Sequence, residues 1–446
     1  MTASCGHDAP AYGPPMCEHI RAAAGPIDYV TRYTGVGTAT DRVCHGCRDA
    51  VAGGRAVETA RACEECFAAG MRTLTGAVGS PEVRERPTAV DPTLRATAVP
   101  AEWGAVADLA AVDGGTAGWL VLCEDGRIVR WEPDSGDWAV LARTEVRVPP
   151  DAEPWSDHWP ARRLHASSDG RFAAVVVDHG RYGEVLDLST GTRTMTLDGG
   201  DYCAETVPFS LAFAQHRDRT VLVHRTEWNR LDVSDPGTGE PLTSRAFAPV
   251  DSDRLRPPHD LDYFHGGLLV SPDGRRVVDD GWVWSPVGVV TAWSLAGWLD
   301  ENPFESEDGA TKSHLASCDY HWNRPLAWLD DHRVAVGGLG EHDYEIVPGA
   351  RVFDVRRTDG AWAAETAAFG GPEGRFFSAD GLLFSASPQG LEVWDPADGA
   401  RLAVLPGFRP THHHRTGREF ARIDGGDGGG ARLLRWRIDP GLVVRR

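Results

Sequence analysis

The chain has 446 residues and a formal charge of −20, and its hydrophobic and charged fractions of 41% and 25% are typical of globular proteins. This negative charge argues against nucleic acid or an anionic membrane surface as a main partner. No apolar run approaches membrane-spanning length, and the first residues lack the basic start and apolar core of a secretory signal. We therefore expect a cytoplasmic protein with no nucleic-acid partner and no membrane partner.

Cysteines are concentrated at the start of the chain, where six of the nine precede residue 67. Two Cys-x2-Cys pairs, Cys44/Cys47 and Cys63/Cys66, have the spacing of a four-thiolate zinc site, and clustered thiols in a reducing compartment more often bind metal than form disulfides. Between the pairs we predict a hairpin that turns at Gly53–Gly54, and after Cys63 the start of a helix that carries the second pair. This order resembles a treble-clef or zinc-ribbon module, which implies a structural zinc ion.

Two shorter pairs, Cys5-Gly-His7 and Cys17-Glu-His19, stand upstream. They could hold a second ion by themselves, or they could interleave with the later pairs in a cross-brace, as in RING-like modules. The predicted zinc ligands are Cys44, Cys47, Cys63 and Cys66 for one ion, and Cys5, His7, Cys17 and His19 for a second. We assign residues 1–80 to this small α+β zinc-binding module.

From residue 84 onward, short β runs alternate with turn signals. Several runs share one shape, in which a strand ends in a large or apolar marker residue and a tight turn closed by glycine follows. The markers that fit fully are Trp131, Leu186, Trp394 and Trp436; Trp293 and Phe353 fit with altered turns, and Ser234 is a weaker match that completes the set. Upstream of several markers stands an Asp-Gly turn, at 167–170, 271–274 and 378–381. This order predicts seven units of four strands each. The units repeat every 40 to 60 residues, roughly, along the chain.

One four-stranded unit cannot bury both of its faces alone, whereas units arranged around an axis bury them against each other and hide most strand edges. Here the chain resembles the WD40 family, most clearly at "GLEVWDPADGARLAVLPG" (390–407) and "LLVSPDG" (268–274). The resemblance implies a mainly β fold, with a seven-bladed β-propeller (six to eight blades) over residues 84–446. Either "TLRATAV" (93–99) or the final "GLVVRR" would close the ring.

In the WD40 family, the loops that lead into each blade share one face with the loops that join its second and third strands. Here these loops are rich in aromatic residues, histidine and carboxylates, which suits a protein or peptide partner. The candidate partner-binding residues are Trp228, Tyr263, His265, Trp282, Asp319, His321, Trp322, His342 and Tyr344. The run His412–His414 could bind a metal, but a solvated loop is the favoured interpretation.

The leading hypothesis is a non-enzymatic interaction scaffold. One alternative is a hydrolase or lyase with its active site in the propeller funnel, although the G-x-S-x-G, H-E-x-x-H and G-x-G-x-x-G signatures are absent. Another alternative is a metal or redox sensor built on the clustered cysteines.

Overall fold

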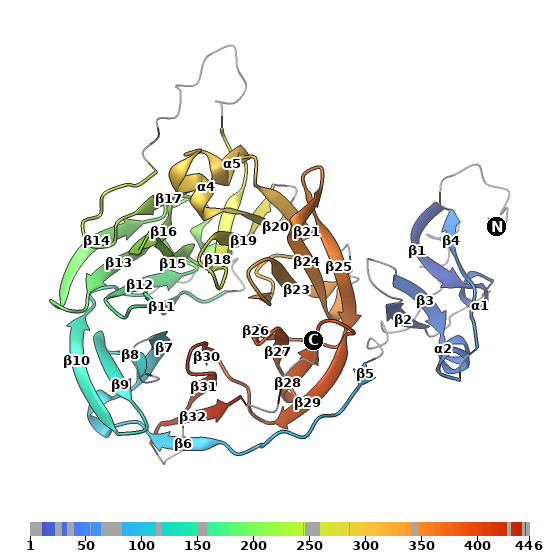
Figure 1. Cartoon of the computed structure of the whole chain (residues 1–446), viewed down its shortest axis with the longest axis horizontal. Helices are drawn as coiled ribbons and strands as arrows, with labels where there is room; N and C mark the ends of the chain where they lie inside the picture. The colour runs from blue at the N-terminus through green and yellow to red at the C-terminus, as the bar shows by residue number, and fades with distance from the viewer. Residues whose placement is uncertain are drawn as a thin grey trace, which may run out of the picture.

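A computed structural model gives the fold of most of the chain. It describes residues 11–22, 29–33, 40–53, 55–63, 83–112, 118–149, 158–243, 245, 259–284, 286–340, 346–425, 430–438 and 442. The first of two structural regions is a small sheet with strand order β2-β3-β1-β4, which stands outside the ring formed by the rest of the chain (Figure 1). Its elements are β1 (Ala11–Cys17), α1 (Glu18–Arg21), β2 (Tyr29–Tyr33), β3 (Thr40–Cys44), α2 (His45–Ala52) and β4 (Thr59–Cys63).

The hairpin predicted between the two Cys-x2-Cys pairs is wrong. Cys44 ends β3 in an extended conformation and caps α2, so the chain enters a helix directly after this cysteine. Gly53 then ends α2 by donating its backbone N–H to Asp49 O, and β4 pairs with β1 rather than with residues 48–52. A treble clef combines a cysteine turn, a hairpin and a helix, and the described residues lack the hairpin. The helix expected after Cys63 lies outside the described residues.

The second region is a ring of antiparallel sheets (Figure 1). The first two units are β7 (Val106–Val112), β8 (Gly118–Cys123), β9 (Arg127–Glu132) and β10 (Asp137–Arg143), then β11 (Ala161–Ala166), β12 (Phe172–Asp178), β13 (Tyr182–Asp187) and β14 (Thr192–Asp198). The third is β15 (Leu211–His216), β16 (Arg219–Glu227) and β17 (Arg230–Ser234). The fourth and fifth are β18 (Phe264–Val270), β19 (Arg276–Val283), β20 (Val287–Ser294) and β21 (Ser313–Asp319), then β22 (Leu326–Trp328), β23 (Arg333–Leu339), β24 (Val347–Asp359) and β25 (Trp362–Gly370).

The last two units are β26 (Arg375–Ala379), β27 (Leu382–Ser387), β28 (Gly390–Asp395) and β29 (Ala400–Pro406), then β30 (His412–His414), β31 (Glu419–Asp424) and β32 (Arg432–Arg437). Short elements complete the ring region: β5 (Arg84–Glu85), β6 (Arg95–Ala98), η1 (Ala101–Trp103), η2 (Ala204–Thr206), α4 (Leu295–Asp300) and α5 (Glu305–Asp308). A parallel bridge between β21 and β25 joins the fourth and fifth units into one eight-stranded sheet. The predicted mainly β propeller is confirmed; its blade number stays a prediction, because the third unit has only three strands among the described residues.

The sequence signals occupy equivalent places in the units. Each of the seven marker residues lies on the third strand of its unit, with its side chain no more than 3% exposed. The Asp-Gly turns join first and second strands; in one of them Ser271 Oγ donates to Asp273 Oδ1 (2.6 Å), which also accepts from the backbone N–H of Arg275 (3.1 Å). The predicted strand order within a unit is therefore correct.

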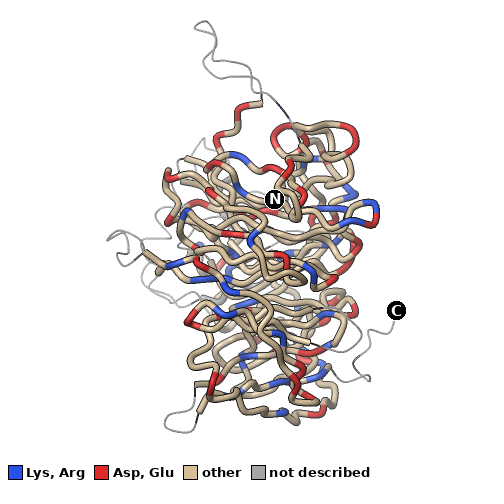
Figure 2. The backbone as a smooth tube through the Cα atoms, turned by 90° about the vertical axis from the view of Figure 1, so that its left-hand side faces the viewer, with Lys and Arg blue, Asp and Glu red and all other residues tan. Residues whose placement is uncertain are grey.

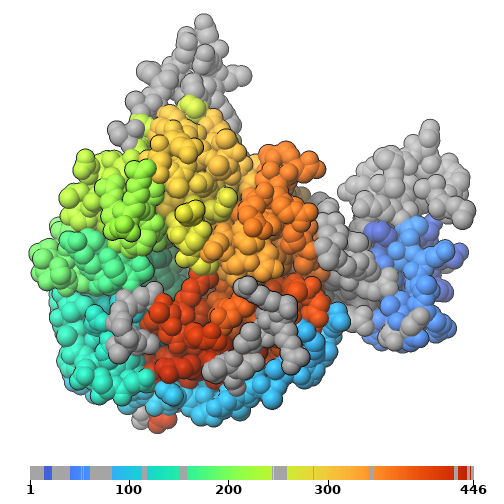
Figure 3. Space-filling model, viewed as in Figure 1, coloured from blue at the N-terminus to red at the C-terminus, as the bar shows by residue number. Residues whose placement is uncertain are grey.

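The ring is closed by "TLRATAV". Strand β6, from this segment, pairs antiparallel with β32, so that Thr97 lies opposite Leu433, and Val99 N–H donates to Ala431 O (2.9 Å). In Figures 1 and 3 the cyan segment that contains β6 lies along the outside of the red C-terminal strands. The first ring residues thus supply the outer strand of the last unit, and β5 adds a parallel strand to β29.

The hydrophobic core lies between neighbouring units rather than at the ring centre. Leu120 and Leu122 of the first unit, for example, belong to the same buried cluster as Val175 and Val177 of the second. Each sheet therefore buries both faces against its neighbours, and loops at the two ends of the ring remain for other roles.

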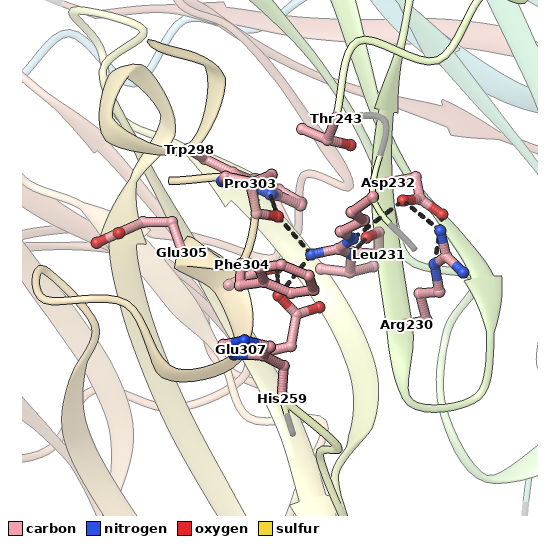
Figure 4. Close-up of polar contacts among 12 residues, drawn as sticks. Arg230, Leu231, Asp232, Thr243, His259, Trp298, Pro303, Phe304, Glu305 and Glu307 are labelled. Atoms are coloured by element: carbon pink, nitrogen blue, oxygen red, sulfur yellow. Dashed lines mark hydrogen bonds and ion pairs between the residues drawn. The ribbon is translucent and has the colours of Figure 1, made fainter. Parts of the chain in front are cut away.

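The third unit has three strands among the described residues, and a short segment follows the third of them. Residues 241–243 run beside β17, where Leu242 N–H donates to Val233 O (2.7 Å). The fully buried Arg245 side chain then donates to Glu307 Oε2 (2.5 Å) and Pro303 O (2.7 Å) of the α4–α5 insertion (Figure 4). Its guanidinium also lies over the Trp298 ring. This buried ion pair fixes the insertion against the unit at the place where strand pairing stops.

Candidate metal centre and loop face

The candidate metal centre is built at the ends of two neighbouring strands. Strands β1 and β3 are parallel, so their C-terminal ends meet at one edge of the sheet. Each strand ends in a cysteine that caps a helix, Cys17 before α1 and Cys44 before α2. The first turns of these helices then bring His19 and Cys47 to the same place. The ligand atoms of Cys17, His19, Cys44 and Cys47 all lie within 4.8 Å of one another.

The donor set suits zinc. His19 Nδ1 lies 3.1 Å from Cys47 Sγ, and the backbone N–H of Cys44 points at Cys17 Sγ (3.4 Å). Cys17 and Cys47 are buried, Cys44 is half-buried and His19 is exposed. Three sulfurs and one imidazole nitrogen match the four-coordinate composition of structural zinc sites, and they leave no open position for substrate.

The thiols of this cluster differ in acidity. Burial, assisted by hydrogen bonds to Cys44 and Cys17, raises the pKa of Cys47 to about 12. Burial also acts to raise the pKa of Cys44, but hydrogen bonds from the Cys47 backbone and from the Cys47 and Cys17 side chains outweigh it, and the net pKa of Cys44 is lowered. Because a metal ion binds thiolates, metal binding at such a cluster releases protons.

The cluster takes one pair from each predicted ligand set. Cys17 and His19 come from the second set, and Cys44 and Cys47 come from the first. These four residues thus combine an upstream pair with a later pair, as in the interleaved alternative considered from the sequence. Cys63 ends β4, but its side chain, like all of Cys5, His7 and Cys66, lies outside the described part of the structure. Elsewhere in the described residues, no other three His, Cys or carboxylate ligands come comparably close together.

A row of stacked aromatic rings crosses one face of the propeller. It runs from Tyr202 to Phe264 (centroids 5.6 Å apart), from Phe264 to Trp282 (4.0 Å) and from Trp282 to Trp322 (5.2 Å). Tyr202 and Trp322 come from the loops that lead into the third and fifth units, Phe264 begins β18, and Trp282 lies near the end of β19. The row therefore connects three consecutive units on the face where the sequence predicts a binding surface.

Thr206 fixes the row by hydrogen bonds. Its carbonyl oxygen accepts from Trp322 Nε1 (3.0 Å) and Asn323 Nδ2 (3.2 Å), and its hydroxyl accepts from Trp282 Nε1 (3.2 Å). Since both indole N–H groups are satisfied inside the protein, these rings are held as a rigid platform.

Several of the predicted partner-binding residues are too buried to contact a partner. Tyr263, His265 and Trp282 are 3%, 1% and 3% exposed, and His265 Nδ1 lies 2.6 Å from the equally buried Asp279 carboxylate. The half-buried members of the predicted set are Trp228, Asp319, His321 and Trp322. His342 and Tyr344 lie outside the described residues.

Two of the exposed aromatic residues of this face, Trp284 and Tyr320, are neighbours of predicted residues, and two others lie in loops for which no residue was predicted. The four are Trp159 (79% exposed), Tyr320 (62%), Trp284 (50%) and Tyr202 (48%), which we call the loop-face aromatics. Loop composition pointed to the segments of Trp284 and Tyr320. It could not separate Trp282, near the end of β19, from Trp284, which directly follows this strand, because only the packing against Phe264 and Trp322 buries Trp282.

The histidine run His412–His414 is not a solvated loop, as the sequence suggested, but strand β30. His412 Nε2 lies 2.9 Å from Asp108 Oδ1, His413 stacks on Phe420, and His414 Nε2 lies 3.0 Å from Val112 O. Each histidine is thus used in packing or hydrogen bonding.

Comparisons with known proteins give no family for this chain. No family model matches it, and no curated protein matches it. Among solved structures, a chain of a mitotic checkpoint complex is 14% identical with a TM-score of 0.45, over 80% of this chain and 96% of that one. The computationally designed protein Ika8 is 16% identical with a TM-score of 0.45, over 78% and 88%. At these scores the fold assignment depends on the strand pairing given above.

Within the described residues, no helix is both long enough and apolar enough to cross a lipid bilayer.

Proposed function

We propose that this protein is a non-enzymatic interaction scaffold in a reducing, cytoplasmic setting, and that its propeller binds a protein or peptide through the loop-face aromatics. The observation that carries the proposal is that exposed aromatic rings pack directly on buried ones. Tyr202 and Trp284, each about half exposed, contact the buried Phe264 and Trp282 directly. Large aromatic side chains on a rigid support lose little entropy on binding, which is typical of interaction hot spots.

The charges near these rings indicate the chemistry of the partner. Glu227 is exposed beside Trp228, whose ring contacts Tyr202. Asp201, next to Tyr202, lies 3.4 Å from Arg181 Nη1 and still keeps 85% of its side chain exposed. Carboxylates beside apolar rings favour a segment that carries basic and apolar side chains together.

The test compares two double variants of the full chain in affinity capture from the native host, followed by binding measurements with the purified partner. Trp284→Ala with Tyr320→Ala removes two loop-face aromatics. Trp138→Ala with Trp362→Ala removes rings of similar exposure (40% and 46%) from the outer strands β10 and β25. We expect the first variant to lose at least tenfold in affinity and the second to bind normally. Equal binding by both variants contradicts the proposal.

The second part of the proposal is that Cys17, His19, Cys44 and Cys47 hold a structural zinc ion. The closed set of four donors and the backbone N–H directed at a thiolate support this assignment. Metal analysis should find zinc in the purified full chain, and Cys44→Ser should remove one equivalent. Cys203→Ser, at a half-buried thiol outside the cluster, serves as the control.

If Cys5, His7, Cys63 and Cys66 hold a second ion, the full chain contains two equivalents and Cys66→Ser removes only one of them. Retention of the metal after mild oxidation disfavours the sensor alternative. A zinc content that Cys44→Ser leaves unchanged rejects the assignment.

A further inference from the structure

A cavity of about 580 Å³ lies at the centre of the propeller, and the first strand of every unit contributes to its wall. Its two sides differ in chemistry. Strands β15, β18 and β22 contribute only apolar residues, which include Phe213, Leu269 and Trp328. Strands β11, β26 and β30 and the turn after β30 contribute the charged and titratable groups. These are Arg163, His165, Arg375, His412, His413 and Arg415.

No carboxylate stands in the described wall of this cavity. The nearest acidic groups lie behind it and are already engaged. Asp108 lies 3.4 Å from Arg163 Nη1 and 2.9 Å from His412 Nε2, and Asp178 lies 3.0 Å from Arg163 Nε. Arg163 and His412 thus lie beside carboxylates that can neutralise their charge, whereas the other two arginines of the wall have other partners.

Arg415 Nη2 donates to Trp328 O (3.2 Å) and Ser378 Oγ (3.1 Å). Arg375, which is exposed, is not ion-paired with these aspartates. Its Nη1 donates to Thr411 O (2.6 Å), a neutral acceptor, and it forms no ion pair with a described residue. The pKa of Arg375 is lowered, first by desolvation of its guanidinium at the ring centre and then by the Arg163 cation, while the Asp108 and Asp178 carboxylates act to raise it. The same wall holds two buried ring nitrogens without hydrogen-bond partners, His165 Nε2 and His413 Nε2. Unpaired buried groups of this kind call for a ligand or water.

A second cavity, of about 420 Å³, adjoins the first at Arg375 and Thr411, which line both. It adds Arg409, which is exposed, and Arg422, whose Nη2 lies 3.3 Å from Asp424 Oδ1. Among the described residues, three arginines therefore meet one aspartate around this cavity, in a protein that has 45 basic and 65 acidic residues. The lining of these cavities is therefore locally positive although the whole chain is negative, and Arg375 lines both cavities.

Guanidinium groups bind phosphate and carboxylate oxygens in preference to other partners. The apolar side of the central cavity, where Leu269 is 38% exposed, would bury an uncharged group attached to such an anion. Cavities of this volume accept ligands of metabolite size.

We propose that the central cavity binds a small organic oxyanion, with its phosphate or carboxylate head at Arg375 and an apolar body against β15, β18 and β22. This site is independent of the loop face and needs no protein partner.

The test is calorimetric titration of the full chain with matched fragments. Phenyl phosphate has both the anionic head group and the apolar body, whereas inorganic phosphate has only the head group and phenol only the apolar body. Phenylacetate has the same phenyl ring with a carboxylate in place of the phosphate. We expect either phenyl phosphate or phenylacetate to bind at least tenfold more tightly than inorganic phosphate or phenol, and the tighter of the two identifies the head group. If no probe binds at millimolar concentration, or if inorganic phosphate binds as tightly as the whole fragments, the proposal is wrong.

Variants locate the site. Arg375→Gln keeps a donor for Thr411 O but removes the charge, and it should weaken the best fragment at least tenfold. Arg409→Gln changes an exposed side chain that cannot affect folding and should weaken it severalfold. Arg356→Gln, at an exposed arginine of β24 that lines neither cavity, is the control and should bind normally. Equal binding by all three variants rejects the site, and normal fragment binding by the Trp284→Ala, Tyr320→Ala variant keeps this result separate from the loop-face test.

Discussion

Two tryptophans at the end of β19 show how one loop holds both a supporting and a contacting residue. Trp282 is 3% exposed between Phe264 and Trp322, whereas Trp284 is 50% exposed. We expect Trp282→Ala to lower the free energy of unfolding by about 3–5 kcal/mol, because it leaves a large cavity. Trp284→Ala should lower it by less than about 1 kcal/mol. Urea unfolding of the two variants measures this difference, and equal losses would show that the aromatic row is not a packed unit.

Lys312, the only lysine of the chain, provides a second test at a single residue. Its Nζ donates to Ser306 O (2.9 Å) and Glu307 O (3.0 Å), and it lies over the Tyr263 ring. Burial lowers the pKa of Lys312 from its ordinary value of 10.5 to about 8. Between these two pH values the folded protein has released a proton that the unfolded chain still binds, so the free energy of unfolding rises with pH across this window.

The resulting stabilisation is complete above about pH 10.5 and is lost as the pH falls to about 8. Lysine labelled with ¹³C at Cε gives one side-chain resonance, since there is one lysine. We expect it to titrate near pH 8 in the folded protein and near 10.5 in urea. A folded-state titration above pH 10 would mean that the amine is solvated.

At the scale of elements, local signals were predictable and long-range pairing was not. The marker residues and Asp-Gly turns act within a few residues, so the sequence gives their places in each unit correctly. The closing partner of β32 lies more than 300 residues away in β6, and nothing local distinguishes "TLRATAV" from the C-terminal residues. The third unit also differs, because its described residues form three strands and a buried Arg245–Glu307 ion pair follows the segment beside β17.

The metal centre was predictable in the same partial way. Cysteine spacing identified ligand types and pairs, because a strand end followed by a helix turn places two ligands together. Which pairs share an ion depends on the parallel pairing of β1 and β3, a tertiary feature that spacing does not contain.

Ring closure by β6 can be tested in the full chain. Val99 donates its backbone N–H to Ala431 O (2.9 Å), and its side chain is 9% exposed. Val99→Pro removes this donor and should lower the free energy of unfolding by about 1–3 kcal/mol. Leu94→Pro, at a 38% exposed position before β6 begins, is the matched control and should cost clearly less. Equal effects in urea unfolding would indicate that β6 contributes little to the closed ring.

At the scale of the whole molecule, the net negative charge should repel large polyanions but not a small anion inside the central cavity. Acidic and basic residues are interspersed on the side of the protein shown in Figure 2, while the formal charge of the chain is −20. A large polyanion meets this net negative field, whereas a small anion inside the central cavity meets Arg375 at short range. We expect no retardation of duplex DNA in a mobility assay at physiological salt. Retardation there would show that a basic surface outweighs the net charge.

The whole chain should also unfold in two steps. In the described residues, strands β1 to β4 pair only with each other, and the large buried clusters of the ring contain no residue before Val83. Where the burial of its side chains is described, the small sheet buries few apolar ones, so its stability should depend on the metal at Cys17, His19, Cys44 and Cys47.

We therefore predict that a chelator abolishes one calorimetric transition, that of residues 1–80, and leaves the melting temperature of the ring, residues 84–446, unchanged within about 1 °C. Cys44→Ser should reproduce the chelator result without added chelator, and Cys203→Ser should not. A single transition that shifts as a whole on chelation would instead show that the zinc module and the propeller are one cooperative unit, with the metal stabilising both.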